Sequence, residues 1–363
     1  MIETDLHLEP NEASDLCRVF SPEVLAGHGW DRAFVTVLDE APAEEAIALL
    51  VHAAGTGLEA GWEALRVHAD AGSDAGRTED AEACARRDGF VYLLGSQFGK
   101  KAGPLAAKRS WIARASEKGL EVAAGGGRAE LEIARLRFGL HRAVNDALAA
   151  AAVELISLGP SAREAYIDAT IAHGAQNAKR WAGRISSADH PINVEAVEFR
   201  ADGRLLLGLR YPVTADGHPL LVEVLDVEAL FADPDTEVRC GAVWWLDDTG
   251  TKETPVGFRA LDGFGDDVFD AVVGDLDAAN KSATVLEDHP EGGRADSEHR
   301  RFTLPLVAAG GPVTSDLVHH FGDVRRVEGV AVDHEGHAHY VIDEEGHVAL
   351  RTLTIEDGDS GRD

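Results

Sequence analysis

The sequence predicts an all-β fold, a β-propeller of five blades, with six blades as the alternative. Three observations predict it. A strand–turn–strand pattern recurs along the chain, its copies are spaced at the length of elaborated blades, and the first strand and the last copy complete each other. Because one such meander leaves faces and edges uncovered, its copies are expected to pack against one another.

The pattern is clearest in residues 327–344, VEGVAVDHEGHAHYVIDE. The run Val330 to Val332 contains β-branched residues that suit a buried strand. A polar turn follows, in which Gly336 can take the positive φ of a tight hairpin. Residues 337–342 then alternate polar and apolar, and residues 347–355 continue as a further strand. This copy therefore predicts a three-stranded antiparallel meander.

Each copy opens with a charged residue that precedes small and apolar residues. These anchor residues are Asp15, Glu82, Glu195, Arg259 and Glu328. Their spacings are 67, 113, 64 and 69 residues. Four-stranded propeller blades run roughly 40 to 50 residues and lengthen when loops are elaborate. Three spacings therefore suit one blade each, and the spacing of 113 residues requires an insertion.

The insertion is predicted to be helical and to cover residues 140–182. Residues 142–156 contain helix formers throughout, and Pro160 ends that run. Residues 161–164, SARE, form a capping box that opens a second helix toward Trp181. The alternative is a degenerate sixth blade in this segment. With either outcome, residues 1–357 are predicted to form a single domain and residues 358–363 a disordered tail.

The two ends of the chain are predicted to meet in one sheet. Residues 2–8 form a short strand with no adjacent partner, and the last copy contains only three strands. If the N-terminal strand becomes the fourth strand of the last blade, both gaps close and the free edges disappear.

The chain is strongly acidic, with 64 Asp and Glu against 34 Lys and Arg and a formal net charge of -30. Such a surface repels phosphate groups, which argues against nucleic acid or an anionic membrane as a partner. Acid excess with few lysines resembles proteins from salt-loving organisms, although a GC-rich genome favours a similar composition.

The cysteines and the apolar runs predict a reduced, cytoplasmic protein. Cys17, Cys84 and Cys240 are too scattered for a disulfide framework, and the first two occupy positions where other copies have apolar core residues. The first twelve residues lack the pattern of a secretory signal. No apolar run is long enough to cross a membrane.

Several short motifs resemble one family of propellers. They are Glu82-Ala83 with Leu94-Gly95-Ser96, Lys108-Arg109, residues 193–196 with 208–212, Gly257-Phe258-Arg259, and Glu328-Gly329 with Asp343-Glu344. The chain resembles the family catalogued as domain of unknown function 3616, and more loosely the phytase-like and SdiA-regulated propellers. That resemblance covers most of residues 15–353 and implies the propeller fold. The histidine typical of the family after Gly-Ser is Gln97 here, and the glycine before the proline is Tyr211.

The anchors predict a binding site, because the innermost strands of a propeller surround its axis and start near one mouth of the channel. The predicted metal ligands are the acidic anchors Asp15, Glu82, Glu195 and Glu328. The other candidate ligand-binding residues are Asp39, Ser96, Arg109, Arg210, Arg259 and Asp343. Calcium suits converging carboxylates because it accepts six to eight oxygen ligands in flexible geometry. The alternative is that each acid only pins its own blade by accepting backbone N–H bonds. His337 and His339 predict a zinc or nickel site more weakly.

Two functions remain open at this point. One is a propeller without catalytic activity that binds a small molecule, an ion or a protein at its channel mouth. The other is a calcium-dependent hydrolase of phosphoesters or carboxylic esters. In that case the metal would activate water, and Arg210 and Arg259 would stabilise the developing negative charge.

Overall fold

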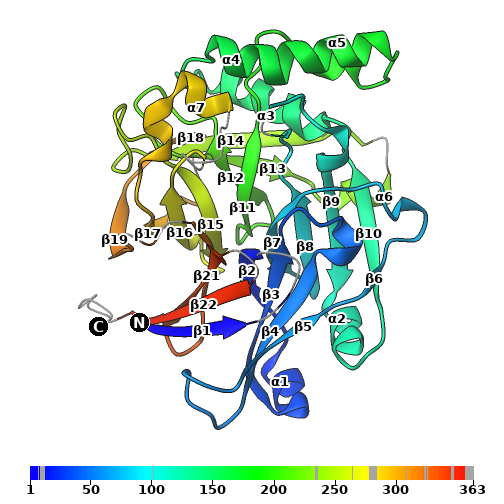
Figure 1. Ribbon diagram of the computed structural model, residues 1–363, viewed down its shortest axis with the longest axis vertical. Coiled ribbons are helices and arrows are strands. Elements are labelled where there is room, and N and C mark those ends of the chain that lie inside the picture. Colours follow the sequence, from blue (N-terminus) through cyan, green and yellow to red (C-terminus); the bar gives the residue numbers. More distant parts are fainter. Residues whose placement is uncertain are drawn as a thin grey trace.

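The computed structural model describes residues 1–6, 8, 13–100, 102–233, 236–263, 265–277, 284–307, 309–322, 324, 326–344 and 347–355, except that the side chains of residues 343, 344 and 347 are left out. Strands dominate these residues and form five mostly antiparallel sheets. The predicted tail 358–363 lies outside the described residues. Figure 1 shows the sheets arranged side by side, with the helices outside them.

The first and last sheets contain four strands each. The first has the order β2-β3-β4-β5, with β2 (Ala13–Arg18), β3 (Trp30–Leu38), β4 (Ile47–Ala53) and β5 (Trp62–Arg66). The last has the order β1-β22-β21-β20, with β1 (Ile2–Leu6), β20 (Val327–Val332), β21 (His337–Glu344) and β22 (His347–Thr354). The N-terminal strand β1 pairs with β22, as the sequence predicted.

The second, third and fourth sheets lie between these two along the chain. The second contains β6 (Ala69–Asp70), β7 (Ala81–Arg87), β8 (Phe90–Gly95), β9 (Trp111–Ser116) and β10 (Ala129–Arg135). The third contains β11 (Asn193–Phe199), β12 (Leu205–Tyr211), β13 (Leu220–Leu225), β14 (Arg239–Leu246) and β18 (Gly310–Val313). The fourth contains β15 (Gly257–Gly263), β16 (Val268–Gly274), β17 (Glu298–Thr303) and β19 (Ser315–His320).

One strand of each sheet, here called its first or inner strand, contacts the inner strands of the two neighbouring sheets. β2 contacts β7, β7 contacts β11, β11 contacts β15, β15 contacts β20, and β20 contacts β2. Apolar residues fill the space between neighbouring sheets. One such core contains Trp244 of the third sheet and Phe258 of the fourth. Another contains Ala260 of the fourth sheet and Tyr340 of the last. The chain therefore has a propeller-like fold.

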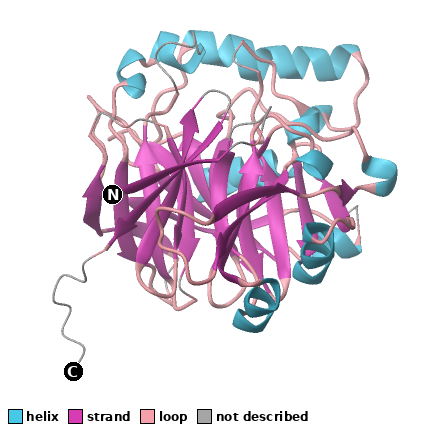
Figure 2. Ribbon diagram, turned by 60° about the horizontal axis from the view of Figure 1, so that its bottom comes forward, coloured by secondary structure: helices cyan, strands magenta, loops and turns pink. Residues whose placement is uncertain are grey.

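The segment predicted to be helical contains α3 (Gly139–Ala150) and a second stretch of consecutive helical elements. That stretch consists of α4 (Pro160–Ala162), a π-helix (Arg163–Asp168) and α5 (Ala169–Gln176). Phe138, Tyr166 and Ile167 of this segment pack on Phe98 and Tyr211, which lie next to the ends of β8 and β12. The segment thus covers one end of the sheets, as Figures 1 and 2 show.

Four short helices cap other loops, and one of them corrects a sequence prediction. They are α1 (Pro22–His28), α2 (Glu117–Ala124), α6 (Ala229–Ala232) and α7 (Thr284–Asp288). From their apolar content, residues 120–123 are predicted to be the outer strand of the second blade, but they lie in α2, and β10 takes that place. The Ser116 side chain accepts a hydrogen bond from the Gly119 N–H, an N-cap that starts a helix where apolar content alone suggested a strand.

Candidate functional site

A β-bulge occurs near the start of the first strand in every sheet. In each strand, one residue is skipped in the pairing with the second strand. The skipped residues are Ser14, Glu82, Glu195, Arg259 and Glu328. A bulge breaks the alternation of faces and re-aims the side chain of the extra residue. These five side chains consequently share one direction relative to their sheets.

All five bulged residues line one cavity of about 650 Å³, here called the mouth cavity. Eight of the residues that the sequence proposed for the site also line it. They are Asp39, Glu82, Ser96, Arg109, Glu195, Arg210, Arg259 and Glu328. Asp343 lies in β21, and its side chain is outside the described part of the chain. Among the described lining residues, nine are Asp or Glu and five are Lys or Arg, so the cavity is acidic.

The structure corrects the prediction that Asp15 is a metal ligand, because the Asp15 side chain does not line the mouth cavity. Its carboxylate is fully buried and accepts hydrogen bonds from the backbone N–H groups of Leu16 and Cys84, both at 2.8 Å. The bulged residue is its neighbour Ser14, and a one-residue shift along a strand reverses the face. Asp15 therefore joins the first sheet to the second, the pinning role that the sequence left open.

Replacing Asp15 by Ala is expected to destabilise the fold without changing binding at the mouth cavity. Two buried N–H groups would lose their acceptor, which costs about 1–3 kcal/mol for each group left unsatisfied. Urea unfolding measures the loss, and calcium titration of the folded variant measures the site. A variant of unchanged stability with weakened calcium binding would restore Asp15 as a ligand.

One side of the mouth cavity consists of paired charges, here called the arginine wall. The Arg210 Nη1 atom lies 3.0 Å from Glu195 Oε1, and its Nη2 atom lies 3.1 Å from Asp275 Oδ1. Arg259 Nη1 lies 3.4 Å from the same Asp275 oxygen, and Arg259 also pairs with Glu195 and Glu328. Burial opposes ionisation of Glu195, but Arg210 and Arg259 outweigh it and lower the pKa of that carboxyl. Glu195 is thus held ionised by two cations of the protein itself.

The other side, here called the acid wall, brings together Asp39, Asp80 and Glu82. One oxygen from each lies within 4.8 Å of the others. Arg109 Nη1 lies 2.7 Å from Asp80 Oδ2, and the Ser96 hydroxyl donates to that same oxygen. Burial, followed by repulsion from Asp80, raises the pKa of Asp39 to about 7. Burial, followed by repulsion from Asp39, raises the pKa of Glu82 well above its usual range. In contrast to Glu195 on the arginine wall, Asp39 and Glu82 thus have raised pKa values.

Asp80 and Asp275 are site residues that the sequence reasoning missed. Asp275 directly follows β16, the same place that Asp39 and Ser96 occupy after β3 and β8, so this strand-to-turn pattern could have found it. Asp80 precedes β7 and has a φ of 64°. Asp80 has no counterpart in the repeat pattern. Acids just before a strand are also common at turns, so its sequence position carried no signal.

A second group of possible metal ligands, formed by Asp333, Glu335 and His337, is already paired with Arg32. Arg32 Nε lies 2.6 Å from Asp333 Oδ2, the oxygen that also contacts His339 Nε2 at 3.1 Å. The remaining Asp333 oxygen accepts the backbone N–H groups of Glu335 and His337, both at 2.9 Å. The oxygens of Asp333 are thus used within the protein, which disfavours the zinc or nickel interpretation of this hairpin.

Comparisons with known proteins add little to this geometry. No family model matches the chain, and no curated protein is significantly similar, so the resemblance to domain of unknown function 3616 stays a prediction. A Bacteroides ovatus structure described as xyloglucan PUL GH43B matches with a TM-score of 0.41 and 12% identity, over 98% of this chain and 55% of that one. The extracellular domain of a one-component system from B. thetaiotaomicron matches with 0.29 and 8%, over 96% and 40%.

The chain thus spans about half the length of these solved structures or less, and at such scores neither likeness bears on activity. Among the described residues, no helix has the length and apolar character that crossing a bilayer requires.

Proposed function

We propose that this chain is a five-bladed propeller that binds calcium, alone or with a small polar ligand, at the mouth cavity. Five sheets whose first strands contact one another in turn support the blade count. The acid wall is the observation that carries the binding proposal. A cation placed among its three carboxylates would relieve their mutual repulsion.

The contrast between the two walls favours a cation from solution over an anionic ligand. Arg210 and Arg259 are already bound to carboxylates, so an anion would have to displace Glu195 or Asp275 from them. On the acid wall, by contrast, Asp39 and Glu82 ionise only at the cost of burial and repulsion. A bound cation removes that cost.

Calcium suits the acid wall because its ligands are oxygens. Three carboxylates offer up to six of them, and the hydroxyl of Ser14, which donates to Glu82 at 3.2 Å, lies beside the group. Asn193 Oδ1 belongs to another lining residue and is buried without a hydrogen-bond partner within the described chain. That atom supports a polar ligand with a donor group in the same cavity.

Calcium titration of chelator-treated protein is expected to give saturable micromolar binding and a raised melting temperature. Binding to the native state alone stabilises it, by about 2.7 kcal/mol at one hundred times Kd. Calcium needs ionised carboxylates, and the pKa of Asp39 is about 7. Affinity should therefore rise as the pH rises from about 6 to 8. Calorimetry at these pH values, in high and low salt, checks both expectations.

Asp80→Asn is the variant that tests the acid wall, and Asp146→Asn on the exposed surface of α3 is its control. Asp80→Asn should weaken calcium binding at least tenfold, because it removes a central charge. Asp146→Asn should bind as the wild type does. Equal binding by wild type and Asp80→Asn, or no binding at either salt concentration, would end the calcium proposal.

A calcium-dependent hydrolase of phosphoesters or carboxylic esters is the second candidate. The observation in its favour is the separation of pKa values within one cavity, lowered for Glu195 and raised to about 7 for Asp39, which suits a base and an acid. Since Arg210, Arg259 and Arg109 are paired with carboxylates, stabilisation of negative charge would pass to Lys100, another cation of the lining. Release of p-nitrophenol from p-nitrophenyl phosphate and acetate, with and without calcium, tests this candidate. Calcium binding without turnover would leave binding alone.

A further inference from the structure

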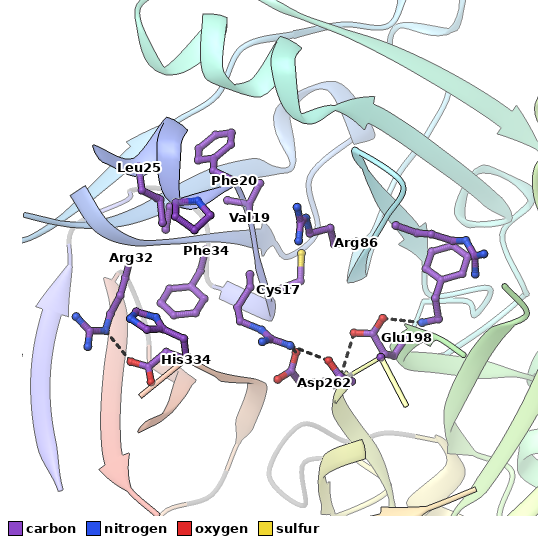
Figure 3. A pocket seen from close by; sticks show the side chains of 18 of the residues that line it. Cys17, Val19, Phe20, Leu25, Arg32, Phe34, Arg86, Glu198, Asp262 and His334 are labelled. Atoms are coloured by element: carbon purple, nitrogen blue, oxygen red, sulfur yellow. Dashed lines mark hydrogen bonds and ion pairs between the residues drawn. The ribbon is translucent and has the colours of Figure 1, made fainter. Parts of the chain in front are cut away.

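A second cavity, of about 790 Å³, lies at the other end of the same five inner strands. The mouth cavity meets the starts of these strands, whereas the second cavity meets their ends, including Arg18 of β2, Arg86 of β7, Glu198 of β11 and Asp262 of β15. Figure 3 shows Arg86, Glu198 and Asp262 among the side chains around the opening. The two cavities share no lining residue among those described.

One side of the second cavity is apolar. Val19, Phe20 and Phe34 are buried there, while Leu25 of α1 and Trp30 of β3 are only half-buried. The rings of Phe20 and Trp30 stack with centroids 6.4 Å apart. Figure 3 shows Phe20, Leu25 and Phe34 together on one side, away from Glu198 and Asp262. This wall can accept the apolar body of a small molecule.

The facing wall contains two carboxylates and one nearby guanidinium group. Arg18 Nη2 donates to the Gly263 carbonyl at 2.7 Å and lies 3.5 Å from Asp262 Oδ1. The Glu198 carboxylate accepts the backbone N–H groups of Phe199 at 2.6 Å and Gly263 at 3.2 Å. Two acids thus share the positive charge of Arg18.

The other arginines that line the second cavity each have an acidic partner other than Glu198 and Asp262. Arg86 pairs with Glu117 of α2, Arg87 with Asp88 at 2.9 Å, Arg32 with Asp333 at 2.6 Å, and Arg200 with Asp267 at 2.9 Å. Glu198 differs from the other acids of this lining, because the hydrogen bonds described for it come from backbone N–H groups. The wall therefore offers a carboxylate to a positively charged ligand.

We propose that the second cavity binds an organic cation with an apolar body, such as an arylalkylammonium ion. Its ammonium group would lie against Glu198 and Asp262, and its apolar part against Leu25 and Trp30. Pockets that bind small molecules combine an apolar lining with a few convergent polar groups, and this cavity lies within their usual range of roughly 300–1,000 Å³. The proposal concerns a site separate from the calcium site and does not depend on it.

Three matched probes test the charge requirement: 4-phenylbutylamine, 4-phenylbutanol and 4-phenylbutyrate. The amine is expected to bind about tenfold or more tightly than the alcohol, since hydrogen bonds to a charged group are stronger than neutral ones. The carboxylate should not bind. Calorimetry of the wild-type protein measures all three. Equal affinities for the three probes, or no binding of the amine at 10 mM, would overturn the proposal.

Protons released when the amine binds provide a further test, which needs only the wild-type protein. The groups around Glu198 are Asp15, Cys17 and Arg18 on β2, Cys84 and Arg86 on β7, and Asp262 on β15. Burial, followed by repulsion from Asp262, raises the pKa of Glu198 to about 8. A bound cation favours the ionised form, so at pH 7 binding should release protons and tighten as the pH rises toward 8. Calorimetry in buffers of different ionisation enthalpy measures this release, and its absence would contradict the assignment to Glu198.

Variants distinguish this site from the mouth cavity, whose acid wall could also attract an amine. Glu198→Gln should weaken amine binding about tenfold and remove its pH dependence, and Leu25→Ala should weaken all binding while leaving the charge preference. Asp80→Asn should bind the amine as the wild type does. Loss of amine binding in Asp80→Asn, with Leu25→Ala unaffected, would place the amine at the mouth cavity and overturn the proposal, even if Glu198→Gln does not fold.

Discussion

Replacing Arg259 by Met is expected to destabilise the protein by about 3–5 kcal/mol, because it leaves a buried group of acids without their central cation. Arg259 is 3% exposed, and its guanidinium group contacts Glu195, Asp275 and Glu328. Met fills similar space and removes the charge. The decrease in the free energy of unfolding therefore measures the electrostatic contribution of the arginine wall more than its packing. Urea unfolding at neutral pH measures the effect.

Arg239→Met is the matched control for this prediction. Arg239 pairs with Asp226, but both side chains are exposed, at 66% and 59%, and exposed ion pairs contribute about 0–1 kcal/mol. A loss at Arg259 as small as that at Arg239 would show that water or ions already screen the acids of the arginine wall.

Replacing Arg200 by Met is expected to have an effect of the same size, about 3–5 kcal/mol, at the other end of the inner strands. The Arg200 side chain is 1% exposed and forms two hydrogen bonds to Asp267, at 2.9 and 3.2 Å. It also pairs with Glu223 and donates to the Pro305 carbonyl at 2.9 Å. Since Asp267 and Pro305 follow strands of the fourth sheet, Arg200 joins that sheet to the third.

The pH dependence of this loss has a definite sign. Burial opposes ionisation of Asp267, but its hydrogen bonds to Arg200 and the Ala201 N–H lower its pKa below the usual value of 3.8. A lowered carboxyl pKa stabilises the native state above the unfolded pKa and loses that effect as the pH falls through the folded pKa. The difference between wild type and Arg200→Met, measured by urea unfolding, should therefore be largest near pH 7 and shrink below about pH 4.

Arg200→Lys separates charge from geometry at this position. Lys keeps one positive charge but cannot form the forked pair with Asp267, so an intermediate loss is expected. If Arg200→Lys were as stable as the wild type, the forked geometry would be irrelevant and the charge alone would account for the stabilisation.

The propeller-like fold could be predicted because its signals are local. Alternating strands, glycine turns and the recurrence of anchors are all properties of short segments, and four of the five anchors proved to be bulged residues. The pairing of β1 with β22 was also predictable, since an incomplete last copy requires a fourth strand. Cys17 and Cys84, predicted to be core residues, are both buried.

One failure at the site occurred where a single residue changes the direction of a side chain. The position of the bulge places Ser14, and not Asp15, at the mouth cavity, and no local pattern distinguishes the two. The sequence also could not show that Arg210 and Arg259 form ion pairs with Glu195, Asp275 and Glu328, because these acids belong to three different sheets.

The sequence by itself determined most of the strands, the helical segment, the acidity of the chain and eight of the residues that line the mouth cavity. Only the tertiary structure decided which acids are neutralised by arginine and which, like Asp39 and Glu82, are left with raised pKa values. It also revealed the second cavity. The physical reason is that strand formation depends on neighbours along the chain, whereas ionisation depends on burial and on charges brought close from distant segments.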